Sequence, residues 1–171
     1  MSDFEIRSTT MAAAPEVLAL YRAAADGAGG LARRPEEMDL AYVEGFLAKA
    51  HAGGVSLGAW SEGRLVGEIH AGRIGPNQFA HVLSDLTIAV DPACQGRGVG
   101  RALFGALFAA AAQLQPKVSR IELMAREGNA GAIRLYQALG FAVEGRLPGR
   151  VRLPDGTVEA DIAMGLLLPD A

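Results

Sequence analysis

Residues 90–101 read VDPACQGRGVGR and carry the strongest structural signal in the chain. They follow a nearly continuous apolar run at 83–90, which predicts a strand covered on both faces. They lead into residues 98–114, where apolar side chains at spacings of three and four predict an amphipathic helix. Three alternating glycines at a helix start let a ligand approach the backbone N–H groups, and the helix dipole and two arginines add positive charge. The stretch therefore predicts a cradle for a pyrophosphate.

Glycine-rich loops before a helix also have other roles. An ordinary tight turn between a strand and a helix also uses glycines. A P-loop needs Lys and Ser/Thr after its last glycine, but Val99, Gly100 and Arg101 occupy that region, which disfavours ATP hydrolysis. A dinucleotide-binding fold needs the loop after an early strand and an acidic residue about 20 residues later, and Glu122 keeps this alternative open.

The composition indicates one globular domain, residues 1–171, half of whose residues are apolar. A charged fraction of 20% and a net charge of -3 exclude wholesale disorder and give no basic field for nucleic acid. The longest apolar tract, 102–114, is shorter than the roughly 20 residues that span a bilayer, so no membrane partner is expected. The single cysteine, Cys94, suits a reducing compartment and favours a cytoplasmic location. The histidines and acidic residues lack metal-ligand spacing, so no metal is expected.

Apolar periodicity and turn residues predict a mixed α/β domain with a central sheet of about seven strands and about four flanking helices. The predicted order is βααβββαβαββ. Strands are expected at 4–8, 55–60, 64–73, 83–90, 118–125, 141–144 and 158–168, and helices at 15–25, 35–50, 98–114 and 129–139.

Two motifs give the sequence a family resemblance. The loop QGRGVG at 95–100 matches every defined position of the Gln/Arg-x-x-Gly-x-Gly/Ala loop that follows the fourth strand of GCN5-related N-acetyltransferases. Residues 129–141 contain a second matching pattern, Asn-x-x-Ala-x-x-Leu-Tyr-x-x-x-Gly-Phe, at a separation typical of the family. The sequence thus resembles the GNAT superfamily over most of its length, with a specific signal at 83–145. The run at 140–145, the Asp-Gly pair at 155–156 and Asp161 look most like small bacterial amino-acid and peptide amine acetyltransferases.

The resemblance implies a GNAT fold with splayed fourth and fifth strands. It implies transfer of the acetyl group of acetyl-CoA directly to an amine of a small molecule, such as an amino acid, through a ternary complex. Two alternatives remain open: a protein or peptide N-acetyltransferase, and a non-catalytic acyl-CoA-binding sensor. The expected partners are acetyl-CoA and the amine acceptor, and homodimers are common among similar proteins.

The resemblance also implies where acetyl-CoA would bind. The fourth strand would offer backbone groups to the pantetheine arm and an N–H to the thioester oxygen, the glycine loop would hold the pyrophosphate, and Asn129 would contact the cofactor from the other side. A helix N-cap is the alternative role for Asn129. The expected cofactor contacts are Ile88, Ala89, Val90, Gln95, Gly96, Arg97, Gly98, Val99, Gly100, Arg101, Asn129 and Tyr136.

Tyr136 is the expected general acid, because a phenol with an ordinary pKa near 10 can protonate the departing thiolate. The alternative role for Tyr136 is that of an aromatic residue packed in the core. Cys94 is interpreted as packing rather than as a nucleophile, since no histidine lies near it in sequence.

Glu68 is the first candidate for the base that deprotonates the amine. His70 shares its strand face by alternation, and Asp85 and His81 are further candidates. The ribosomal-protein branch of the family uses a glutamate on the fifth strand, where Met124 stands here with Glu122 two residues away. The segment 27–37, which carries Arg33, Arg34, Glu36 and Glu37, is expected to border the acceptor site.

Overall fold

The computed structural model describes residues 4–26 and 31–169. The predicted order of strands and helices is confirmed. The elements are β1 (Glu5–Ser8), α1 (Ala14–Ala25), α2 (Leu40–His51), β2 (Val55–Ser61), β3 (Arg64–Arg73), β4 (Val82–Val90), α3 (Val99–Ala111), β5 (Arg120–Arg126), α4 (Ala130–Ala138), β6 (Ala142–Arg152) and β7 (Val158–Leu167).

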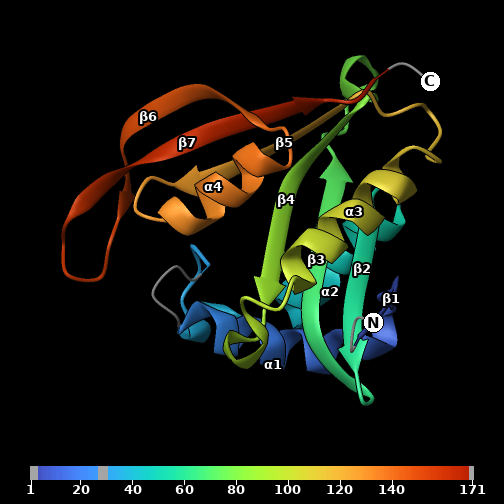
Figure 1. The fold of residues 1–171 in the computed structure, drawn as a ribbon, viewed down its shortest axis with the longest axis horizontal. Coiled ribbons are helices and arrows are strands. Elements are labelled where there is room, and N and C mark those ends of the chain that lie inside the picture. Colours follow the sequence, from blue (N-terminus) through green and yellow to red (C-terminus); the bar gives the residue numbers. More distant parts are fainter. Residues whose placement is uncertain (1–3, 27–30, 170–171) are drawn as a thin grey trace.

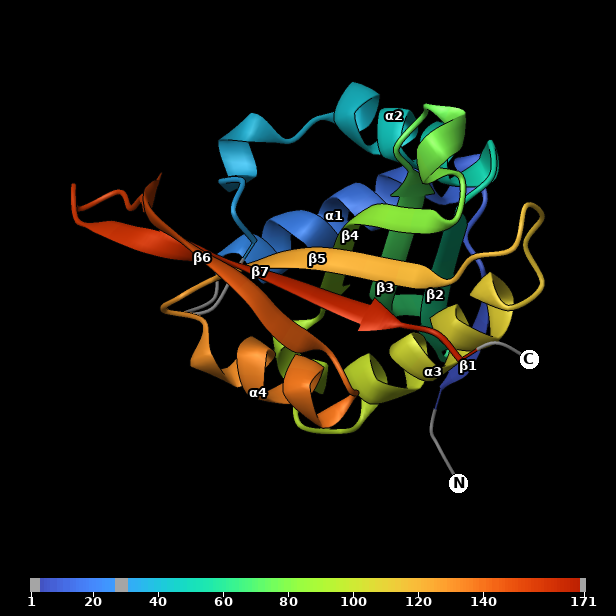
Figure 2. The same cartoon turned by 90° about the horizontal axis from the view of Figure 1, so that it is seen from above.

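All seven strands form one sheet in the order β1-β2-β3-β4-β5-β7-β6. Neighbouring strands are antiparallel, except for the parallel pair β4 and β5. Helices α1 and α2 cover one face of the sheet, and α3 and α4 lie on the other (Figures 1 and 2). None of the helices in the described residues is both long and apolar enough to span a membrane.

The parallel pair β4 and β5 separates soon after it forms. Only Val82 with Arg120 and Leu83 with Ile121 are in register, although β4 continues to Val90 and β5 to Arg126. The two strands diverge beyond these pairs (Figure 1). The expected splay is therefore present, and it leaves the C-terminal half of β4 without a strand partner on the β5 side.

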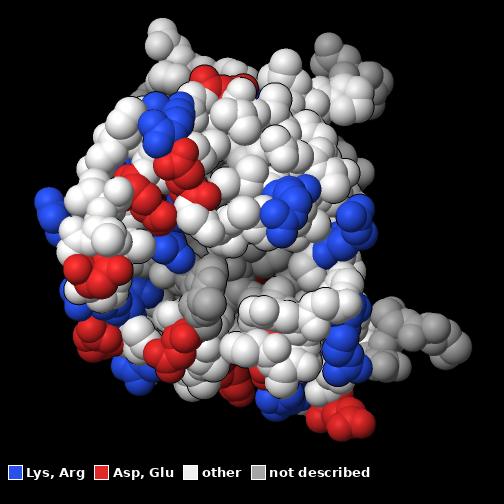
Figure 3. Space-filling model, turned by 60° about the vertical axis from the view of Figure 1, so that its left-hand side comes forward, with Lys and Arg blue, Asp and Glu red and all other residues white. Residues whose placement is uncertain are grey.

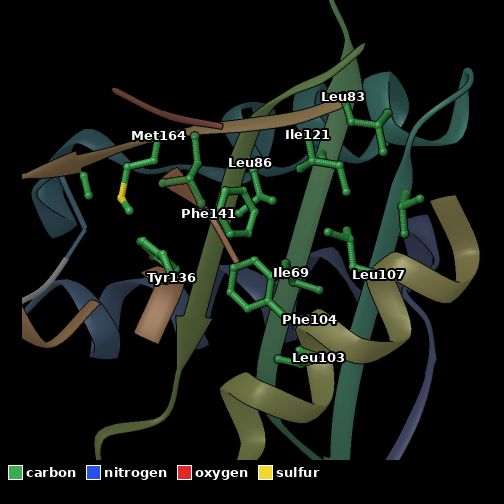
Figure 4. Packing of buried hydrophobic residues seen from close by; sticks show 14 of the residues in the cluster. Ile69, Leu83, Leu86, Leu103, Phe104, Leu107, Ile121, Tyr136, Phe141 and Met164 are labelled. Atoms are coloured by element: carbon green, nitrogen blue, oxygen red, sulfur yellow. The ribbon is translucent and has the colours of Figure 1, made fainter. Parts of the chain in front are cut away.

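Two apolar clusters pack against the two faces of the sheet. One lies between α3 and the sheet and includes Ile69, Phe104 and Leu107 (Figure 4). The other lies beneath α1 and α2 and includes Tyr21 and Leu47. The strand β4 contributes to both clusters, as its apolar run predicts.

The helix α3 packs closely on β3 because Gly67 has no side chain. A Cβ atom there would lie 2.8 Å from Cγ1 of Val99 and 3.0 Å from Cδ1 of Leu103. The first turns of α3 therefore rest directly on the sheet, and the loop before the helix is held beside the ends of β3 and β4.

Several predicted element ends were wrong. The second helix begins at Leu40, because the Asp39 side chain accepts a hydrogen bond from the Tyr42 N–H (2.8 Å) and caps it, while Pro35–Glu37 forms a separate 3-10 turn. The long helix ends at Ala111 rather than at residue 114.

The sixth strand is longer than the predicted 141–144 and continues to Arg152. Its pairing with β7 is interrupted by a register shift between Leu147 and Val151, where Pro148 lacks an N–H and Gly149 has a φ of +71°. Most side chains of β6 are exposed, so the apolar alternation that reveals a strand is missing.

Candidate functional site

Asp91 fixes the direction in which the chain leaves β4. Its N–H donates to the carbonyl of Val66 (2.9 Å), which holds it against β3. Its carboxylate accepts hydrogen bonds from the N–H of Ala93 (2.8 Å) and from Nη1 of Arg64 (2.8 Å). The 3-10 turn Pro92–Cys94 follows, so the glycine loop starts from a fixed position.

Two of the three loop glycines adopt a conformation that other residues rarely adopt. Gly96 has a φ of +73° and Gly98, the N-cap of α3, a φ of +83°, each with open space where a Cβ would lie. Gly100 is in the helix, and a Cβ there would meet only Leu135 and Ile88 at ordinary contact distances of 3.7 and 3.8 Å. Backbone strain therefore explains the first two glycines only.

The start of α3 provides donors for an anion. The carbonyl of the N-cap Gly98 accepts a hydrogen bond from the N–H of Ala102 (3.0 Å), which closes the first turn of the helix. The N–H groups of Val99, Gly100 and Arg101 precede that bond, at the end of the helix where the dipole is positive.

A cavity of about 760 Å³, called here the first cavity, opens between the loop, the splayed half of β4 and the start of α4. The described residues that line this cavity include all of the predicted cofactor contacts except Arg97. Nη1 of Arg97 instead lies 4.0 Å from Sγ of Cys94. The lining residues from β4, the loop and α4 include Ile88, Ala89, Val90, Cys94, Gln95, Gly96, Gly98, Val99, Gly100, Arg101, Asn129 and Tyr136.

Tyr136 belongs both to the core and to the wall of the first cavity. Its side chain is 8% exposed, and its ring packs edge-on against Phe104 and beside Phe141 (Figure 4). None of the described residues hydrogen-bonds its hydroxyl. Burial raises the pKa of Tyr136 to about 12, so the phenol keeps its proton at neutral pH.

Asn129 is the N-cap of α4. Its Oδ1 accepts a hydrogen bond from the N–H of Ala132 (3.2 Å), and the residue also lines the first cavity. The capping role is therefore confirmed, and the contact with a ligand stays a prediction.

Glu68 is completely buried, in contrast to the substrate-facing base expected from sequence. Its carboxylate accepts hydrogen bonds from the hydroxyls of Tyr21 (2.5 Å) and Ser56 (3.0 Å) and lies 3.1 Å from Nδ1 of His70. Alternation correctly placed Glu68 and His70 on one face, but α1 covers Glu68 with Tyr21. Glu68 is not among the described residues that line either cavity, so it has no direct access to an amine.

Burial, reinforced by the neighbouring Glu68 charge, raises the pKa of Tyr21 well above its ordinary value. The Tyr21 hydroxyl also lies 3.1 Å from Nδ1 of His70. The His70 ring stacks on Phe46 with centroids 3.9 Å apart, so its orientation is fixed from two sides.

A second cavity, of about 280 Å³, lies on the face covered by α2. It is lined by Arg33, Tyr42, Phe46, Lys49, His70, Gly72, Asp85 and Thr87. Sequence reasoning proposed His70 and Asp85 as bases and expected the segment that contains Arg33 to border the acceptor, but it missed the residues from α2. Residues 27–30 of that segment lie outside the described residues.

The remaining base candidates differ in their access to these cavities. Asp85 has a φ of +52°, lines the second cavity and forms an ion pair with Lys49. His81 is not among the described residues lining either cavity. On β5, Glu122 pairs with Arg120 (3.1 Å), and Met124 is 42% exposed.

Comparison with known proteins identifies the family. Residues 17–141 match the model of the acetyltransferase (GNAT) family, and the chain belongs to that family. A stretch of 62 residues, 36% of this chain, is 47% identical to an uncharacterized protein of Mycobacterium leprae, and it covers only 16% of that protein's length.

Solved structures share the fold across nearly the whole chain. A ribosomal-protein-alanine N-acetyltransferase of Brucella melitensis is 29% identical, with a TM-score of 0.82 and coverage of 96% of this chain and 99% of that one. A putative acetyltransferase of Salmonella typhimurium with its cofactor acetyl-CoA is 22% identical (TM-score 0.84, coverage 98% and 95%). A phosphinothricin acetyltransferase of Sinorhizobium meliloti in complex with acetyl-CoA is 19% identical (TM-score 0.84, coverage 98% and 89%).

Proposed function

We propose that the protein transfers the acetyl group of acetyl-CoA directly to an amine of a small molecule, with both substrates bound together. The first cavity carries this proposal, because it joins an anion-binding helix start to an unpaired strand edge and a protonated phenol. Membership in the acetyltransferase family supports it, as do the two similarly folded proteins that hold acetyl-CoA.

The residues of the first cavity fit acetyl-CoA. Its volume of about 760 Å³ lies within the range of roughly 300–1,000 Å³ that is common for ligand sites. The N–H groups after Gly98 and the guanidinium of Arg101 would hold the pyrophosphate. The open edge of β4 would pair with the amide groups of the pantetheine arm, and a backbone N–H there would stabilise charge on the thioester oxygen.

Tyr136 would act as the general acid. The thiolate that leaves the thioester needs a proton, and Tyr136 lines the cavity with its hydroxyl protonated. The aromatic packing of its ring fixes the direction of the hydroxyl, which is the requirement for a positioned acid.

We assign the proton acceptor for the amine to His70 and a positioning role to Glu68. His70 reaches the second cavity, whereas Glu68 lies behind it at 3.1 Å. A buried carboxylate on Nδ1 holds an imidazole in one orientation and stabilises its protonated form, as in catalytic triads. Glu68, the first candidate from the sequence, would therefore act through His70 rather than on the amine.

Acetylation of a peptide N-terminus is the second candidate function. The 29% identity to the Brucella melitensis ribosomal-protein-alanine N-acetyltransferase supports it. Against it, Met124 stands where that branch is expected to have a glutamate, and the nearby Glu122 is engaged by Arg120.

A panel of acceptors tests the proposal. The purified protein is incubated with acetyl-CoA and amino acids, polyamines, aminoglycosides or peptides, and thiol release is followed against an amine-free control. We expect release that depends on a small amine. Faster release with peptides would favour the second candidate, and tight acetyl-CoA binding without release from any amine would identify a sensor.

A further inference from the structure

We propose that the second cavity is the acceptor subsite and that it takes a free amino acid, whose carboxylate is held by Arg33. This inference rests on the proposed acetyl transfer and names the class of its acceptor. It is carried by the position, the charges and the size of the cavity.

Both cavities are lined by the same stretch of β4. Thr87 lines the second cavity, and its neighbour Ile88 lines the first. In the ladder between β3 and β4, Thr87 is directly opposite His70, which faces the second cavity. An amine in this cavity would therefore lie beside His70 and next to the splay where the thioester would bind.

The charged groups around this cavity leave one positive charge for a ligand. Lys49 and Asp85 form an ion pair with each other, and the stem of Lys49 packs over Gly72. Arg33 has no acidic partner within ion-pair distance among the described residues. Its neighbour Arg34, in contrast, pairs with Glu36 (3.5 Å).

The guanidinium of Arg33 is held in place by an aromatic ring. Its Cζ lies 4.4 Å from the centroid of the Tyr42 ring, which is a cation–π geometry. A carboxylate is the ligand that this planar group binds best, through two parallel hydrogen bonds. Figure 3 shows one face of the molecule, on which both acidic and basic side chains are present.

The size and walls of the cavity fit a single amino acid. A volume of about 280 Å³ is at the lower end for small-molecule sites, and Tyr42 and Phe46 provide an apolar wall. We therefore expect an amino acid with an apolar side chain, such as leucine or phenylalanine, rather than a polyamine.

Steady-state kinetics with a free amino acid and with its amide test the assignment. The amide keeps the amine and the side chain but lacks the carboxylate. We expect the wild type to prefer the acid through a lower KM. In Arg33→Gln, the KM for the acid should rise by about 10- to 100-fold, while kcat and the KM for the amide change little. Arg34→Gln is the matched control and should behave as the wild type.

Equal KM values for the acid and the amide in the wild type would overturn the carboxylate assignment. The same rise in KM for both substrates in Arg33→Gln would overturn it as well. Turnover of peptides or polyamines with no activity on amino acids would also overturn it, while leaving acetyl transfer intact. Absence of thiol release with every amine, despite acetyl-CoA binding in calorimetry, would overturn the proposed function and this inference together. Circular dichroism of both variants is the control for their folding.

Discussion

Replacing Tyr136 by Phe separates the proposed chemistry from packing. The substitution removes only the hydroxyl, keeps the ring contacts with Phe104 and Phe141, and breaks no hydrogen bond to a described residue. Because the buried hydroxyl has no hydrogen-bond partner among the described residues, its removal should not lower the free energy of unfolding at pH 7. Loss of a general acid should lower kcat by about 10²- to 10⁴-fold and change the KM for acetyl-CoA little.

The free energy of unfolding of the same variant at alkaline pH tests the burial of the phenol independently. Burial raises the pKa of Tyr136 from 10.0 to about 12, so the folded protein binds this proton more tightly than the unfolded chain does. The stabilisation is complete below pH 10 and is lost as the pH rises from 10 to 12. Two pKa units correspond to about 2.7 kcal/mol. Tyr136→Phe should lack this loss, while the contribution of Tyr21 is common to both proteins and cancels.

Urea unfolding at pH 7, 10 and 12, together with steady-state kinetics, measures these quantities. An unchanged kcat would remove Tyr136 from the role of acid. A fall in kcat accompanied by a large loss of stability at pH 7 would refute the separation of chemistry from packing. An equal loss of the free energy of unfolding between pH 10 and 12 in the two proteins would refute the raised pKa of Tyr136.

Three further changes have defined outcomes in urea unfolding. Gly98→Ala should destabilise the protein by about 1–2 kcal/mol through its positive φ alone, because the space for a Cβ is open. Gly105→Ala, inside α3, is the matched control and should stabilise the protein by up to about 1 kcal/mol. Gly67→Ala should cost about 1–3 kcal/mol and weaken acetyl-CoA binding, since its Cβ would displace the start of α3; normal affinity in calorimetry would contradict this. Glu68→Ala should cost at least about 2 kcal/mol by leaving buried donors unpaired, and Glu68→Gln less, so equal losses would argue against the hydrogen-bond network.

The walls of the first cavity could be predicted because their signals are local in sequence. The apolar run of β4, the glycine loop and the apolar stripe of α3 are consecutive, and each has a distinct pattern. Among the expected cofactor contacts, Arg97 does not line the cavity, because spacing does not tell which way a loop side chain points.

The second cavity could be predicted only in part, because it is assembled from distant segments. Arg33, Tyr42, His70 and Asp85 come from a loop, a helix and two strands, and no motif links them. The burial of Glu68 depends on how α1 packs on the sheet, which alternation along one strand does not reveal. The β6 error has a similar origin, since a strand with mostly exposed side chains is defined by its pairing with β7 rather than by its own pattern.

Transfer of an isotopic label tests the central claim most directly. The protein is incubated with a free amino acid and acetyl-CoA whose acetyl group is deuterated, and the products are identified by mass spectrometry. We predict that the label appears on the amino-acid nitrogen in proportion to the CoA released. Label that remains on CoA, or is found only as free acetate, would contradict acetyl transfer to an amine.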